Sequence, residues 1–208
     1  MQLVSDSLTD GTAIDKKYAF AIIDPKNHVA LSDNHNPHLA WSGAPEGTRS
    51  FAVVVHDPDV PSAGDDVNQE GREVPESLPR VDFYHWTLFD IPADQTRLEE
   101  GAHCNGITPR GKNGPEAGNG LSHGKNDYTG WFAGDADMEG DYFGYDGPCP
   151  PWNDSIIHRY VFTVYALDVD TLPAGNDFSG AALVETIKAH ALDSASITCT
   201  YTLNPRLA

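Results

Sequence analysis

Basic residues are scarce in this chain. Against 31 Asp and Glu, the 208 residues contain only 13 Lys and Arg, which gives a formal charge of −18 at pH 7. This charge repels phosphate polymers, and the chain has no basic stripe of the kind that binds nucleic acids. It also has no polybasic segment to attract an anionic membrane. We therefore expect no nucleic-acid partner and no charge-driven docking on bilayers.

Cysteines and long apolar runs are also few. The three cysteines, Cys104, Cys149 and Cys199, form no CxxC pair, so neither a disulfide framework nor a zinc cage is indicated. No run of about 18 apolar residues occurs, and the N-terminal segment contains no basic region followed by an apolar stretch. These absences predict a cytoplasmic protein in a reducing compartment, without integral membrane association.

Short apolar segments predict a mainly β fold. The runs 51-FAVVV-55, 83-FYHWTLF-89 and 159-RYVFTVYAL-167 are rich in β-branched and aromatic residues, as strands are. The chain length and the absence of internal repeats favour a single domain over residues 1–208.

One segment has helical spacing instead. Within 178–192, Leu183, Ile187 and Ala191 recur at intervals of four, which predicts one substantial helix packed on the sheet. The candidate N-caps that precede it are Asn176 and Asp177.

Alternation along the strands assigns side chains to faces. In the strand that begins at His158, this residue and Tyr160 point the same way. In the aromatic segment, His85 shares a face with Phe89, and Trp86 is expected to point away from them into the core.

Two long polar stretches interrupt the strands. Segment 63–81 and an excursion from about 111 to 151, rich in Gly, Asn, Asp and Pro, are expected to be irregular surface loops that form pocket walls or dimer contacts. Trp131 and Trp152 lie in the excursion. Each either covers a pocket or anchors the loop to the sheet, and anchoring is favoured.

Three motifs lie where predicted strands meet Pro-rich loops: 57-DPDVPS-62, 83-FYHWTLFDIP-92 and 144-GYDGPCPPWNDSIIHRY-160. With them, the chain resembles the phosphatidylethanolamine-binding protein family, which includes the Raf kinase inhibitor proteins and bacterial and archaeal relatives. Segment 36–59 looks like the first hairpin of that family, and 194-SASITCTY-201 looks like its C-terminal strand. The resemblance implies a mainly β, Greek-key-like fold with one main helix in the C-terminal region.

The resemblance also implies a binding site for a small anion, of the phosphate-headgroup type. By position in the motifs, Asp57, His85 and His158 would surround the anion, and Tyr160 would be a further pocket residue. The rim would be a turn that contains Gly147, Pro150 and Pro151, with Cys149 in the place of a second glycine of the family pattern.

The chemistry of these residue types is consistent with that site. Imidazole N–H groups can donate to phosphate oxygens, and a neighbouring carboxylate such as Asp57 increases the population of imidazolium. Three alternatives remain open. The histidines could be core residues with backbone partners, a metal could bind His85, His158 and Asp57, or Cys149, His158 and Asp57 could form a catalytic triad. Pro150 argues against the triad because it removes the backbone N–H that follows the cysteine.

The segment 135-DADMEGDYFGYD-146 has acidic residues at positions 1, 3, 5 and 12 and a glycine at position 6, as calcium loops of EF-hands have. The glycines around it argue against flanking helices. A solvated acidic turn is therefore favoured over a cation site.

These observations predict a binding protein with no cofactor, no metal and no catalytic residue. The expected ligand is a small anion or a phosphorylated molecule, and a regulatory role of the kinase- or protease-inhibitor type would involve a protein partner. The alternative is a hydrolase or phosphotransferase that uses the same pocket. A homodimer is favoured over a monomer, because relatives in the prokaryotic branch are often dimeric and small homo-oligomers are mostly two-fold.

Overall fold

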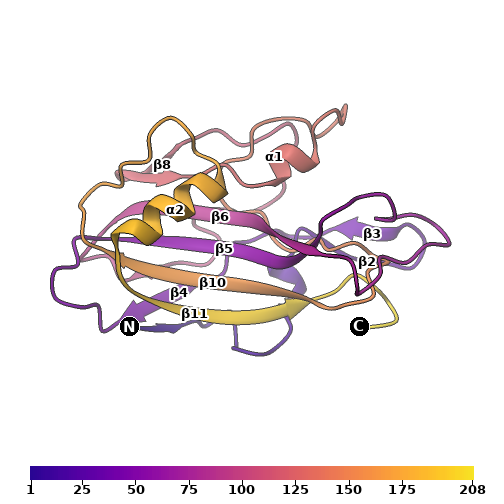
Figure 1. The fold of residues 1–208 in the computed structure, drawn as a ribbon, viewed down its shortest axis with the longest axis horizontal. Helices are drawn as coiled ribbons and strands as arrows, with labels where there is room; N and C mark the ends of the chain where they lie inside the picture. The colour runs from indigo at the N-terminus through magenta and orange to yellow at the C-terminus, as the bar shows by residue number, and fades with distance from the viewer.

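A computed structural model describes residues 1–208. Its main element is a six-stranded antiparallel sheet, drawn as long arrows across the centre of Figure 1. In spatial order its strands are β11 (Ala191–Tyr201), β10 (His158–Leu167), β5 (Ser50–Pro61), β6 (Arg80–Pro92), β9 (Leu121–His123) and β8 (Glu116–Gly118).

Smaller elements complete the fold. A second sheet contains β1 (Gln2–Val4), β4 (Leu39–Ser42) and β7 (Arg97–Leu98), and β2 (Ala21–Asp24) pairs with β3 (His28–Leu31). The helices are a 3-10 turn, η1 (Lys16–Tyr18), the short α1 (Tyr128–Trp131) and the longer α2 (Gly180–His190). The protein is therefore mainly β with one main helix near the C-terminus, as predicted. No helix is long and apolar enough to cross a membrane.

The connection between β6 and β10 gives the main sheet its Greek-key character. Strands β5 and β6 form a hairpin, and β10 then returns to pair with β5 rather than with β6. The predicted excursion lies in this connection, and it is less irregular than expected. It contributes β8 and β9 to the edge of the main sheet, and it carries α1.

The predicted first hairpin is wrong. β4 pairs with β1 and β7 in the small sheet, whereas β5 belongs to the main sheet. The two strands therefore follow one another in sequence without pairing. Both are buried apolar strands, and an apolar pattern does not reveal which neighbour each strand pairs with.

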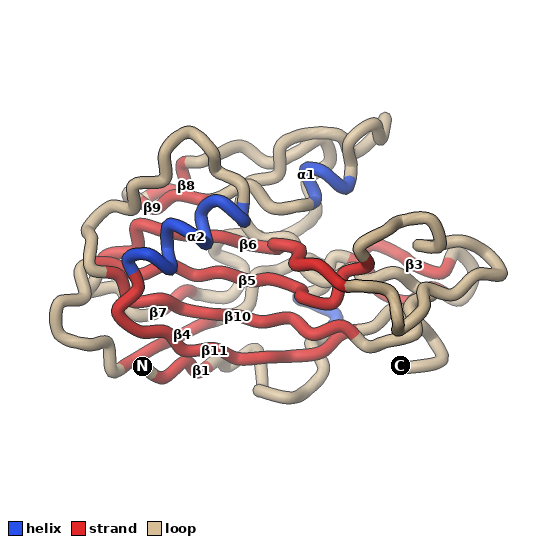
Figure 2. The backbone as a smooth tube through the Cα atoms, viewed as in Figure 1, coloured by secondary structure: helices blue, strands red, loops and turns tan.

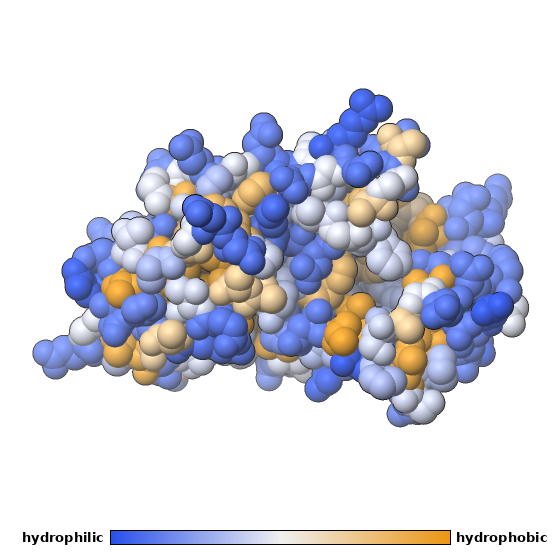
Figure 3. Space-filling model, turned by 45° about the horizontal axis from the view of Figure 1, so that its top comes forward, coloured by the Kyte–Doolittle hydropathy of each residue, from blue (hydrophilic) through white to orange (hydrophobic).

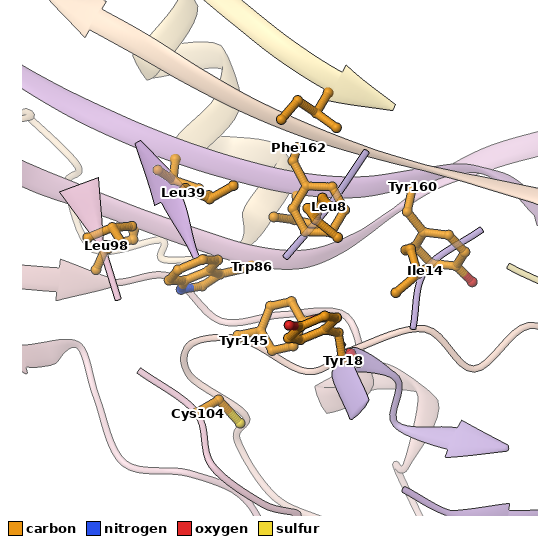
Figure 4. Packing of buried hydrophobic residues seen from close by; sticks show 14 of the residues in the cluster. Leu8, Ile14, Tyr18, Leu39, Trp86, Leu98, Cys104, Tyr145, Tyr160 and Phe162 are labelled. Carbon is orange, nitrogen blue, oxygen red and sulfur yellow. Dashed lines mark hydrogen bonds between the residues drawn. The ribbon is translucent and has the colours of Figure 1, made fainter. Parts of the chain in front are cut away.

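Both faces of the main sheet are covered. Along β5, Phe51, Val53 and Val55 join a large core cluster, while Ala52 and Val54 join a smaller one under α2. Burial on both faces explains why 51–55 is a continuous apolar run rather than an alternating one. Figure 4 shows part of the large cluster, where Tyr160 and Phe162 extend from β10 toward the rings of Tyr18, Tyr145 and Trp86.

Helix α2 lies along one face of the main sheet (Figure 1) and buries Leu183, Val184 and Ile187. Its N-cap is Ser179, whose side chain accepts from the N–H of Ala182, rather than either of the predicted caps. Asp177 instead accepts from the N–H of Ser179. The helix ends earlier than expected, because Ala191 already begins β11.

Candidate functional site

A pocket of about 200 Å³ lies at the end of the main sheet where β5, β6 and β10 meet the long loops. Figure 2 shows how loops gather at this end, between α1 and the β2–β3 hairpin. The wall is mostly apolar and aromatic, and it contains no Lys or Arg. The residues that line it are Asp57, Val60, Pro61, Ser62, Ala63, Gly64, Val67, Asn68, Phe83, His85, Tyr128, Trp131, Cys149, Pro150, Pro151 and Tyr160.

The two long loops form much of this wall. Residues 62–64, 67 and 68 come from the connection between β5 and β6, and Tyr128 and Trp131 come from α1 in the excursion. The prediction that segment 63–81 and the excursion form pocket walls is confirmed. Their contribution to a dimer stays a prediction.

A β-bulge directs His85 into the pocket. In the β5–β6 ladder, Val55 pairs with Trp86 and His56 with Tyr84, so His85 has no partner on β5. The extra residue interrupts the alternation of faces. As a result His85 contacts Tyr128 and Tyr160, two aromatic residues of the large core cluster. The next residue, Trp86, belongs to the same cluster.

The bulge corrects the predicted assignment of faces. Phe89 lies in the cluster under α2, away from His85, and Trp86 lies on the His85 side rather than opposite it. Strict alternation fails here because it assumes a regular ladder. Bulges are common beside binding sites, where they reorient a side chain.

The hydrogen bond of His85 defines its tautomer. Nδ1 lies 2.8 Å from the backbone oxygen of Asp146, and this oxygen can only accept, so Nδ1 carries the proton. Nε2 makes no hydrogen bond to the protein, and in a neutral ring it is an acceptor. Burial lowers the pKa of His85, and the nearby charge of Asp57 only partly opposes this. The free protein therefore has a neutral His85 at neutral pH.

Tyr160 supplies a donor at the pocket wall. Its side chain lines the pocket and is 1% exposed, and its hydroxyl makes no close hydrogen bond, although the Asp57 carboxylate lies near enough to interact with it. Burial, followed by the charge of Asp57, raises the pKa of this hydroxyl far above its usual range, so it stays protonated. A buried polar group without a partner costs about 1–3 kcal/mol, and a ligand oxygen in the pocket would remove that cost.

Asp57 is held by the protein rather than free for a ligand. One carboxylate oxygen accepts from the N–H of Asp59 at 2.8 Å, and the other lies 2.7 Å from Nδ1 of His158. The carboxylate of Asp59 forms a bidentate ion pair with Arg159, at 2.7 and 2.9 Å. Each carboxylate oxygen of Asp57 therefore already has one partner in the protein.

His158 lies behind the pocket and not on its wall. It is fully buried, with Nδ1 bonded to Asp57 and Nε2 lying 3.0 Å from a carboxylate oxygen of Asp154. Burial alone would lower the pKa of His158, but its hydrogen bonds to Asp154 and Asp57 outweigh that effect and raise it to about 9. The imidazolium has no N–H left for a ligand, no lone pair for a metal, and no capacity to act as a base toward Cys149.

Sequence reasoning missed Asp154 and Arg80. Arg80 forms a bidentate ion pair with Asp154, at 2.6 and 3.1 Å, and so extends the chain of charges behind the pocket. This chain holds two cations, Arg80 and His158, and two carboxylates, Asp154 and Asp57, and is therefore neutral. The spacing of Asp154 four residues before His158 was the available signal.

A second buried network holds Asp146, whose backbone oxygen accepts the hydrogen bond from Nδ1 of His85. The carboxylate of Asp146 is 1% exposed and accepts from Asn34, Asn126 and Lys112, at 2.8, 2.8 and 2.7 Å. The backbone N–H of Asp146 also donates to the backbone oxygen of His85, at 3.1 Å. Asp146 and His85 are thus joined in both directions, which fixes the ring orientation.

The predicted rim divides into two parts. Pro150 and Pro151 line the pocket, as does Cys149, whereas Gly147 does not. Gly147 packs against the backbone of Tyr18 and Ala19, where a Cβ would overlap the carbonyl oxygen of Tyr18. Its role is close backbone packing. Cys149 adjoins the large core cluster, and burial raises the pKa of its thiol to about 12.

The remaining candidates are also resolved by position. Trp131 lines the pocket and is 54% exposed, whereas Trp152 stacks on His28 with ring centroids 3.8 Å apart and so anchors its loop. In the acidic segment, Asp135 caps its own turn by accepting from two backbone N–H groups, and Asp146 is buried against Lys112. The carboxylates at positions 1 and 12 therefore do not converge as those of a calcium loop do.

The fold is mainly β, with a pocket at one end of the main sheet, and comparisons identify the family. The family model of phosphatidylethanolamine-binding proteins matches residues 4–202. The UPF0098 protein YbhB of Escherichia coli is 30% identical over 202 residues, which cover 97% of this chain and 99% of that protein. The UPF0098 protein YbcL of the same organism is 32% identical over 200 residues, 96% of this chain and 86% of that protein.

A solved structure supports the same assignment. The crystal structure of Escherichia coli YbcL, described as a new member of the mammalian PEBP family, matches with a TM-score of 0.67 and 29% identity over 97% of each chain. The chain belongs to the phosphatidylethanolamine-binding protein family.

Proposed function

We propose that this protein binds a small anion of the phosphate-headgroup type in the pocket formed by His85, Tyr160 and Asp57. The observation that carries the proposal is the hydroxyl of Tyr160, which is buried without a close hydrogen bond in a pocket where Nε2 of His85 is also free. Buried polar groups are nearly always hydrogen-bonded, so a hydroxyl left in this state favours a ligand as its partner.

The rest of the wall indicates an amphiphilic ligand. Phe83, Tyr128 and Trp131 provide aromatic surface, and Pro150 and Pro151 add rigid apolar surface. Sites of this kind bind the apolar part of a ligand by area and orient it with a few polar groups. We therefore assign the anionic group to the His85–Tyr160 end and an apolar or aromatic substituent to the remainder.

A hydrolase or phosphotransferase in the same pocket is less well supported. His158 has both ring nitrogens engaged by carboxylates, so it has no free nitrogen to accept a proton from a nucleophile. The raised pKa of Cys149 leaves almost no thiolate at neutral pH. The binding function needs neither group to react.

The wider role is proposed on family membership. We infer a regulatory function in the cytoplasm, in which the loaded pocket is sensed by a protein partner of the kinase or protease type, and a homodimeric state. Each of these inferences extends beyond the geometry of the pocket, and the homodimeric state is tested separately from ligand binding, by sedimentation.

Calorimetric titration with phenyl phosphate tests the binding function. Replacing Tyr160 with Phe removes one hydroxyl and should weaken binding at least about tenfold, since a hydrogen bond to a charged group contributes about 1.5–3 kcal/mol. Tyr201→Phe is the matched control, because the Tyr201 hydroxyl donates to the backbone oxygen of Ala21 and lies outside the pocket. Equal affinity in all three proteins, or no binding by the wild type, would contradict the proposal.

A further inference from the structure

The pocket offers an anion no fixed positive charge. No Lys or Arg lines it, and the one charged group on its wall is the carboxylate of Asp57. The Arg80–Asp154–His158–Asp57 chain behind the wall is neutral as a whole, and Lys112 is neutralised by Asp146. An anion that entered alone would therefore place an uncompensated charge in a largely apolar site, which is costly.

The groups that surround His85 reinforce this conclusion. Asp57 and His56 on β5 act on it through their charges, and Tyr128 and Tyr160 pack against it from α1 and β10. Asp146 completes the set from the turn before Gly147. None of these groups is a fixed cation, and burial lowers the pKa of His56 as well. The bare Nε2 of His85 would repel an anionic oxygen unless a proton lay between them.

We propose that the pocket binds its anion together with one proton, which Nε2 of His85 shares with an oxygen of the ligand. The free protein, the free anion and one proton from solvent give the complex, so charge and atoms balance. In the complex, a second ligand oxygen accepts from the hydroxyl of Tyr160. The inference rests on the proposed function. It specifies the ligand class as anions that bind with one proton, carried either by the ligand oxygen or by His85 as an imidazolium.

The Asp146 network leaves Nε2 of His85 as the nitrogen that takes up the proton. Because Nδ1 of His85 is committed to the carbonyl of Asp146, protonation occurs at Nε2, which has no other partner. The adjacent Asp57 carboxylate favours the imidazolium once it forms, and the ligand anion adds to that effect. Binding and protonation therefore strengthen each other, as thermodynamic linkage requires.

Proton uptake can be measured directly by calorimetry. Phenyl phosphate is titrated into the protein at pH 8, where a phosphate monoester with a second pKa of about 6 is a dianion. Two amine buffers with different ionisation enthalpies are used, and the difference in heat gives the number of protons taken up. We expect close to one proton per ligand, and affinity that falls about tenfold per pH unit between pH 7 and 8.

His85→Gln provides the matched variant. The glutamine amide is neutral and cannot take up a proton, so uptake should fall well below one and the pH dependence should flatten. Binding without proton uptake by the wild type would overturn this inference and leave the proposed function intact, whereas no binding would overturn the proposed function. If His85→Gln still takes up one proton per ligand, the proton is bound by another group and the inference is wrong.

Discussion

His158 illustrates how far a residue's role can be predicted from its motif. The sequence placed this histidine beside Asp57 in one constellation, and the two side chains are indeed bonded at 2.7 Å. The second partner of its imidazole could not be predicted, because Asp154 comes from an irregular segment with no strand pattern to orient it. His158 is consequently a buried ion-pair residue behind the pocket, and Tyr160 and His85 carry the free polar atoms.

The ion pairs of His158 make stability depend on pH. Its pKa of about 9 lies above the ordinary 6.5, so this group contributes full stability below pH 6.5, and the contribution is lost as pH rises through 9. The loss is on the order of 3 kcal/mol at 1.36 kcal/mol per pKa unit. Urea unfolding of the wild type should therefore give a lower free energy at pH 9 than at pH 6.5.

Two variants identify the source of that change. Asp154→Asn removes one of the two carboxylates that raise the pKa of His158, so the difference in stability between the two pH values should shrink. Glu46→Gln neutralises an exposed carboxylate that is in no ion pair, and it should leave the difference unchanged. A wild-type stability that is constant over this pH range would show that His158 is not held as an imidazolium.

The reactivity of Cys149 distinguishes a binding protein from a hydrolase. Since burial raises the pKa of its thiol to about 12, iodoacetamide at pH 7.5 should label it more slowly than free cysteine, because only the thiolate reacts. The rate should keep rising with pH above neutrality. Fast labelling that does not vary with pH, together with ester turnover lost on alkylation, would favour the hydrolase.

At the scale of elements, the apolar patterns predicted the central strands and the main helix, because burial on a fixed period leaves a clear trace in sequence. The bulge at His85 left no such trace. It is defined by the pairing of β6 with β5, which depends on contacts between segments. The pairing of β4 with β1 and β7, rather than with β5, was unpredictable for the same reason.

Gly147 was predicted to form the pocket rim, and in the structure it packs against the backbone of Tyr18 instead. A methyl group at this position would overlap the carbonyl of Tyr18, so Gly147→Ala should destabilise the fold by about 1–3 kcal/mol, the usual cost of overpacking. Gly130→Ala is the control, because a Cβ there meets nothing within 4 Å. Denaturant unfolding measures both variants, and equal stability would contradict the close packing of this turn.

For the whole molecule, the charge of −18 is carried mainly by the surface, and Figure 3 shows one face that is predominantly hydrophilic, with hydrophobic atoms in small separate groups. The large exposed hydrophobic side chains come from different parts of the chain: Val4, Leu31, Val81, Trp131, Ile157 and Leu192. A high negative charge keeps proteins soluble and opposes close approach of like copies. A dimer would therefore associate more strongly as salt screens that repulsion.

The homodimer is tested by sedimentation at micromolar concentration and at two salt concentrations. We expect a species of twice the 22.5 kDa chain mass, with a larger share at the higher salt concentration. A species of 22.5 kDa alone under both conditions would contradict the prediction.

The central claim is that a ligand anion lies between His85 and Tyr160, and a crystal structure grown with phenyl phosphate tests it most directly. We predict phosphate oxygens within hydrogen-bonding distance of Nε2 of His85 and of the Tyr160 hydroxyl, with the phenyl ring against the aromatic wall and no ligand contact to His158. A saturated crystal with an empty pocket, or with phenyl phosphate bound elsewhere on the molecule, would contradict the account.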